Sequence, residues 1–109
     1  MKKTIQIDLD GVLNTYIGNY NESEIPPIAD GAIKFLKKLE EHYYLILFSS
    51  REPKKVEEWV KKYEIGKYFT KITNVKQAAY LTIDDRCICF NGDFVKTIKE
   101  IENFKVWWR

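Results

Sequence analysis

Four of the six aspartates in this 109-residue chain occur as two close pairs. Asp8 and Asp10 follow the apolar segment IQI, and Asp84 and Asp85 follow the apolar segment LTI. Side chains alternate along an extended segment, so Asp8 and Asp10 can project to the same side, and Gly11 lets the chain turn sharply after them. Carboxylates held close together repel one another and raise at least one pKa, a cost that a bound cation removes.

Mg²⁺ is the cation that these residues predict. It is a hard ion that takes oxygen ligands and commonly bridges a few carboxylates to a substrate phosphate. Asp8 and Asp10 would supply two acidic residues to the metal site, and Asp84 or Asp85 would supply the third. The sequence does not choose between Asp84 and Asp85.

The elements that must position these residues alternate along the chain. Apolar and β-branched runs predict five strands, at 4–8, 43–48, 69–73, 80–84 and 87–90. Apolar residues at helical spacing predict three helices, at 30–41 with Asp30 as N-cap, at 54–63 after Pro53, and from Asp93 to about residue 103. The two cysteines, Cys87 and Cys89, would be small buried residues of the last strand.

This order of elements predicts a single α/β domain over residues 1–109. The nearly continuous apolar run YYLILF at 43–48 is typical of a strand buried on both faces of a parallel sheet. We therefore expect a Rossmann-like three-layer α/β/α sandwich with a mainly parallel, five-stranded sheet. Ligands bind such sheets beyond the carboxyl ends of the strands, where the two aspartate pairs converge with Ser49 and Ser50, which follow LILF.

These residues resemble the motifs of the haloacid dehalogenase (HAD) superfamily of phosphohydrolases. DLDGV at 8–12 resembles the D-x-D-G-[TV] first motif, and IDD at 83–85 resembles the fourth motif. Between them, Ser49 looks like the Ser/Thr of the second motif, and Lys76 looks like the basic residue of the third. In relatives a proline often follows this lysine, whereas Gln77 follows it here, so Lys71 stays an alternative. The resemblance covers nearly the whole chain.

The resemblance implies an Mg²⁺-dependent phosphatase that cleaves a phosphate monoester. Asp8 would attack phosphorus and form an aspartyl phosphate, and Asp10 would act as general acid and then as general base. The metal would bind Asp8, the main-chain carbonyl of Asp10, and Asp84 or Asp85. The phosphate would contact residues that surround the nucleophile: Gly11, Ser49, Ser50 and Lys76.

Between the motifs there is no room for the cap domain that many members of this superfamily carry. The site would therefore be open, which favours a phosphorylated substrate that is bulky or macromolecular. The segment 14–28 would form a loop beside the nucleophile, and its Tyr16 and Tyr20 could stack on a base or sugar or do nothing specific.

Three other functions stay open. The same residues would support phosphoryl transfer to an acceptor other than water, or a catalytically silent phosphate-binding module. A receiver domain also has an acidic Mg²⁺ site on a parallel sheet, but its phospho-accepting aspartate ends the middle strand, and no aspartate occurs between Gly31 and Ile83. A kinase or ATPase is disfavoured, since the sequence has no G-x-x-x-x-G-K-[ST] loop.

Composition adds expectations about location and partners. A net charge of +2 with 45% hydrophobic residues is an ordinary globular balance. The sequence has neither a signal-peptide pattern nor an apolar run long enough to span a membrane, and with its two cysteines it fits a reduced, cytoplasmic setting. The aromatic residues Phe104, Trp107 and Trp108 are expected to pack on the sheet. The alternative is that they contact a second copy of the chain in a homodimer.

Overall fold

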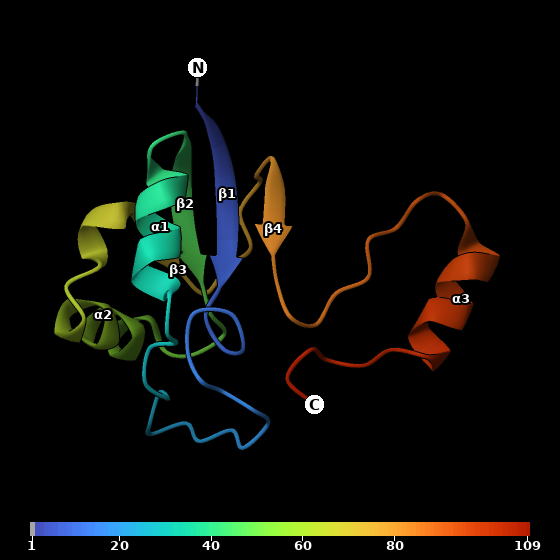
Figure 1. The fold of residues 1–109 in the computed structure, drawn as a ribbon, viewed down its shortest axis with the longest axis horizontal. Helices are drawn as coiled ribbons and strands as arrows, with labels where there is room; N and C mark the ends of the chain where they lie inside the picture. The colour runs from blue at the N-terminus through green and yellow to red at the C-terminus, as the bar shows by residue number, and fades with distance from the viewer. Residues whose placement is uncertain (1) are drawn as a thin grey trace.

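The computed structural model describes residues 2–109 and shows an α/β fold built on a parallel sheet. The sheet has four strands in the order β3-β2-β1-β4: β1 (Lys3–Asp8), β2 (Tyr43–Phe48), β3 (Phe69–Thr73) and β4 (Leu81–Ile83). The helical elements are α1 (Ala32–Glu40), α2 (Pro53–Lys62), a short 3-10 helix η1 (Gly66–Tyr68) and α3 (Phe94–Glu102). All three strand pairings are parallel, so the carboxyl ends of the strands lie along one edge of the sheet (Figure 1).

The hydrophobic core joins one face of the sheet to α1 and α2. Alternate positions of β1 pair with alternate positions of β2, Ile5 with Leu45 and Ile7 with Leu47, so the four side chains share a face. They belong to one buried cluster with residues of both helices, among them Leu36, Val56 and Val60. This packing fixes β1 in the interior and gives Asp8, its last residue, a rigid support.

The opposite face of the sheet is covered near β1 by the link between β3 and β4. Its residues 74–80 contain no helix, yet they donate hydrogen bonds to polar groups of β1. The main-chain N–H of Gln77 donates to Oε1 of the buried Gln6 at 2.7 Å, and that of Tyr80 donates to the carbonyl of Thr4 at 2.8 Å. These bonds hold β4 beside β1.

The predicted fifth strand at 87–90 is wrong, since the sheet described for residues 2–109 has four strands. The reason lies just before it: the main-chain N–H of Arg86 donates to Oδ1 of Asp84 at 3.0 Å, in a turn that directs the chain away from the free edge of β4. Residues 87–90 therefore never pair with β4. Cys87 and Cys89, expected to be buried, are exposed and free.

Two predicted helix caps have different outcomes. Asp93 caps α3 as predicted, because its Oδ1 accepts the main-chain N–H of Lys96 at 3.0 Å. Asp30 does not cap α1; Gly31 takes that position with a φ of 85°, a conformation that favours glycine. None of the helices described within residues 2–109 is long and apolar enough to cross a membrane.

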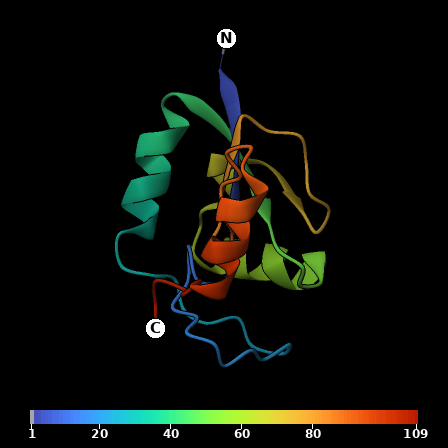
Figure 2. The ribbon, with the colours of Figure 1, turned by 90° about the vertical axis from the view of Figure 1, so that its right-hand side faces the viewer.

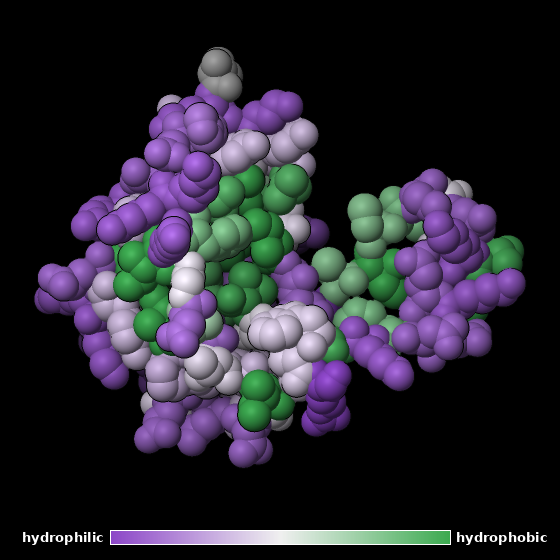
Figure 3. All heavy atoms as spheres, viewed as in Figure 1, coloured by the Kyte–Doolittle hydropathy of each residue, from purple (hydrophilic) through white to green (hydrophobic). Residues whose placement is uncertain are grey.

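Helix α3 stands away from the sheet (Figure 1), and in the view turned by 90° it lies in front of the sheet (Figure 2). None of its residues is buried, and its apolar side chains lie in solvent: Phe94, Val95, Ile98 and Ile101. Figure 3 shows part of this apolar surface on the part of the molecule that contains α3. It lies across a gap from apolar surface on the part that contains the sheet. Helix α3 thus does not supply the third layer of the predicted sandwich. After it, residues 103–109, here named the C-terminal tail, run back toward the carboxyl end of β1 (Figure 1).

Candidate active site

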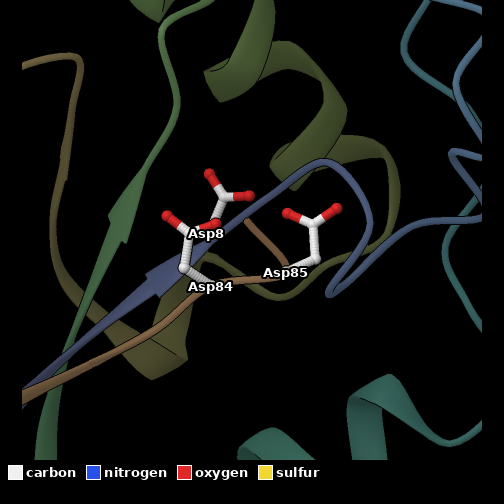
Figure 4. A group of neighbouring side chains, drawn as sticks. All are labelled: Asp8, Asp84 and Asp85. Carbon is white, nitrogen blue, oxygen red and sulfur yellow. The ribbon is translucent and has the colours of Figure 1, made fainter. Parts of the chain in front are cut away.

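Three carboxylates meet where β1 and β4 end. Asp8 is the last residue of β1, and Asp84 and Asp85 directly follow β4, its parallel neighbour. Oxygen atoms of the three side chains all lie within 4.8 Å of one another, and Figure 4 shows the carboxylates gathered at this point. We call these three residues the carboxylate cluster.

The cluster changes the acidity of Asp8. Burial, together with the nearby charges of Asp84, Asp85 and Asp10, raises the pKa of Asp8 from 3.8 to about 8. Without a cation, Asp8 therefore holds a proton at neutral pH. A divalent cation would stabilise the ionised carboxylate and displace that proton.

The cluster fits a magnesium ion by its chemistry and its spacing. Its donors are carboxylate oxygens, and Mg²⁺ binds oxygens at about 2.1 Å in an octahedron whose ligands lie about 3 to 4 Å apart. Oxygens within 4.8 Å of one another can reach one such ion after small rotations. Asp84 and Asp85 each supply an oxygen, so both stay predicted ligands.

Asp10 has a different environment, in which its carboxylate is fixed by Arg51 and Asn14. The Nε and Nη2 atoms of Arg51 donate to Oδ2 and Oδ1 of Asp10 at 2.9 and 3.2 Å, and Nδ2 of Asn14 donates to Oδ1 at 2.9 Å. The Arg51 side chain is 1% exposed and that of Asp10 20%. The Asp10 side chain therefore lies outside the carboxylate cluster, and its predicted metal contact through the main-chain carbonyl stays a prediction.

A pocket of about 250 Å³ brings the cluster together with Asp10, Ser49 and Ser50. Ser49 is buried just after β2, where its Oγ accepts the main-chain N–H of Arg51 at 3.1 Å, so its own proton is free to be donated into the pocket. The remaining side chains that line this carboxylate pocket are Tyr16, Tyr20, Phe48 and Arg86. These groups can hold an anion beside a cation.

Gly11 and Lys76 are the two remaining residues that were predicted to contact the phosphate. Gly11 is next to the cluster, but its main-chain N–H donates to Oδ1 of Asn14 at 3.1 Å, so that donor is already engaged. Lys76 is exposed in the link after β3, and the lining of the carboxylate pocket within residues 2–109 does not include it. The roles of both residues in phosphate binding stay predictions.

The C-terminal tail contacts the site, which sequence reasoning missed. The indole N–H of Trp107 donates to the carbonyl of Gly11 at 2.8 Å, and that of Trp108 donates to Oδ2 of Asp85 at 2.7 Å. The ring of Trp108 also packs edge-on against Tyr16, with centroids 5.6 Å apart. The sequence predicted that the two tryptophans would pack on the sheet, but they contact the loops of the site instead.

Comparison with known protein families, with curated proteins and with solved structures found no match to this chain.

The raised pKa of Asp8 predicts how the stability of the metal-free protein depends on pH. The pKa of Asp8 is about 8 in the folded protein and returns to about 3.8 on unfolding. Between these values the folded state holds a proton that the unfolded state has lost, so the free energy of unfolding falls as pH rises from about 4 to about 8. Thermal unfolding with a chelator present should show this fall, and Mg²⁺ should raise the midpoint more at pH 8 than at pH 5. A stabilisation by Mg²⁺ that is equal at both pH values would contradict it.

Proposed function

We propose that this protein is an Mg²⁺-dependent phosphatase of the HAD type without a cap domain. The observation that carries the proposal is the meeting of Asp8, from the DLDGV motif, with Asp84 and Asp85, from the IDD motif, although 70 residues lie between the two motifs. Four acidic residues, two serines and an arginine around one small pocket can hold a cation and a phosphate together. The bound cation would neutralise charge on the phosphate and keep Asp8 ionised.

The reaction would proceed in two displacements. A carboxylate oxygen of Asp8 forms a bond to phosphorus while the ester P–O bond breaks, and Asp10 gives its proton to the leaving oxygen. A water molecule then attacks phosphorus, gives a proton to Asp10, and releases phosphate as the bond to Asp8 breaks. The two bonds from Arg51 hold the Asp10 carboxyl group in one orientation beside the pocket.

The neighbouring residues would hold the phosphate. The Ser49 hydroxyl, whose oxygen accepts the main-chain N–H of Arg51, would donate a hydrogen bond to the phosphate. Ser50 and Arg86 line the same pocket, and Lys76 would have to approach from the exposed link after β3. The open pocket and the short connections around it favour a substrate whose bulk remains outside.

An aryl phosphate assay with covalent trapping tests this proposal. We expect Mg²⁺-dependent release of phosphate that a chelator abolishes, and a phosphorylated peptide containing Asp8 after rapid acid quenching. Mass spectrometry of that peptide identifies the residue. Turnover that is equal with and without Mg²⁺, or a phosphoryl group on another residue, would contradict the proposal.

A further inference from the structure

A second cleft, here named the basic cleft, adjoins the carboxylate pocket. Its volume is about 610 Å³, and Arg86 lines both spaces. Lys105 and Arg109 of the C-terminal tail also line it, and no acidic side chain of residues 2–109 does. A chain with a net charge of only +2 thus gathers three cations directly beside its candidate phosphate site.

The three cations of the basic cleft have no carboxylate partner. Within residues 2–109 the one ion pair is that of Arg51 with Asp10. The guanidinium groups of Arg86 and Arg109 lie over the ring of Trp108, at 5.3 and 5.7 Å from its centroid, which orients them without neutralising their charge. Their N–H groups remain free to bind an anion, and the planar fork of a guanidinium group matches the oxygens of a phosphate.

Aromatic rings at the same edge are exposed but fixed in place. Trp107 is 73% exposed, yet its indole N–H is bonded to the carbonyl of Gly11, so the ring is held beside the nucleophile loop. Tyr20, which lines the carboxylate pocket, is 54% exposed. Cations that follow a phosphate backbone, interleaved with rings on which bases stack, are typical of single-strand binding surfaces.

We propose that the substrate is a single-stranded polynucleotide with a terminal phosphate monoester. The terminal phosphate lies in the carboxylate pocket, the next backbone phosphate in the basic cleft, and a base stacks on Trp107. The inference rests on the proposed phosphatase function. A cleft of about 610 Å³ is of the size of small-molecule sites and accommodates one nucleotide unit, but not the stacked base pairs of a duplex.

A binding experiment tests the cleft without turnover. The Asp8→Asn protein with Mg²⁺ is titrated into a labelled single-stranded oligonucleotide with a terminal phosphate. When Lys105→Gln and Arg109→Gln are added to the Asp8→Asn protein, the dissociation constant should rise about tenfold. The slope of the logarithm of the association constant against the logarithm of the salt concentration should become shallower by about 1. The matched control, Lys34→Gln with Lys38→Gln on the exposed side of α1, should change neither. If both pairs of substitutions weaken oligonucleotide binding equally, or if neither pair weakens it, the inference is overturned.

The stacking contact is tested at Trp107. Trp107→Ala should weaken binding of the oligonucleotide about tenfold, whereas Trp107→Phe, which keeps a ring and loses the bond to Gly11, should weaken it less. Equal losses would assign Trp107 a structural role only and overturn the stacking part of the inference. A duplex with the same terminal phosphate should bind at least about tenfold more weakly than the single strand, and equal binding overturns the choice of substrate.

Turnover separates failure of the inference from failure of the proposed function. With the wild-type protein, kcat/KM should be higher for the phosphorylated oligonucleotide than for an aryl phosphate, and Lys105→Gln with Arg109→Gln should reduce that ratio. Hydrolysis of the aryl phosphate without such a preference overturns the inference and leaves the phosphatase function standing. Oligonucleotide binding that depends on the cleft, without hydrolysis of any phosphate ester, overturns the phosphatase function instead.

Discussion

Replacement of Asp8 by asparagine should reduce kcat for an aryl phosphate at least about 10⁴-fold, because a carboxamide cannot form the acyl phosphate intermediate. The free energy of unfolding should not fall in the Asp8→Asn protein. At pH 7 and without metal, Asp8 already holds a proton, because its pKa is raised to about 8, so a neutral side chain of the same shape replaces a neutral one. The kinetic measurement is phosphate release with Mg²⁺, and the stability measurement is thermal unfolding with a chelator.

Asp30→Asn is the matched control for this substitution. Asp30 is exposed and lies before α1, away from the carboxylate cluster, so the same chemical change there should leave kcat unchanged. If Asp8→Asn retained wild-type turnover while Asp30→Asn behaved as expected, Asp8 would not be the nucleophile.

The second large effect is expected at Arg51, a positioning residue that orients Asp10. Arg51→Ala removes both bonds to that carboxylate, so kcat should fall about 10²-fold, the lower range of general acid–base contributions. Loss of one partner of a buried ion pair should also reduce the free energy of unfolding by about 3 kcal/mol. Arg51→Lys keeps the charge but loses the planar fork, so its kcat should fall by about tenfold.

Arg51 also donates to the carbonyl of Asn21 at 2.7 Å, so its loss could act by releasing the loop at 15–27. Lys55→Ala separates the two effects, because Lys55 donates to the carbonyl of Glu22 in the same loop at 3.4 Å but, within residues 2–109, makes no hydrogen bond to Asp10. A kcat of Lys55→Ala as low as that of Arg51→Ala would assign the effect to the loop. A wild-type pH profile of kcat in Arg51→Ala would likewise contradict a role through Asp10.

The sequence predicted the strands that carry the site, because their signals are local. The apolar runs of β1, β2 and β4 end in polar residues, and parallel pairing brings such ends to one edge of the sheet. The strand predicted at 87–90 failed because an apolar run pairs only where a free edge is within reach, and the turn at Asp84 directs the chain elsewhere. Similarly, Asp30 has the side chain of an N-cap, but the backbone conformation at Gly31 sets where α1 begins.

Within the candidate site, the sequence predicted what the motifs carry and missed what the fold brings from elsewhere. Asp8, Asp84 and Asp85 come together as expected. The partner of Asp10 was missed, because Arg51 is 41 positions away in the sequence, and only the fold brings it to Asp10. The tail was harder to foresee still, since nothing in the local pattern of VWWR at 106–109 indicates that it returns to Gly11.

Because α3 is exposed, it should unfold locally before the sheet does. A nine-residue helix without buried residues has little stability of its own, so its amide hydrogens should exchange at nearly the rates of an unfolded segment. Those of β1 and β2, at the centre of the sheet, should exchange only through global unfolding. The tail that carries Trp107 and Trp108 is joined to the sheet through this helix. We therefore expect the tryptophans to unfold with α3 and not with the sheet, so that mild denaturant breaks their bonds to Gly11 and Asp85 while Asp8 remains in place.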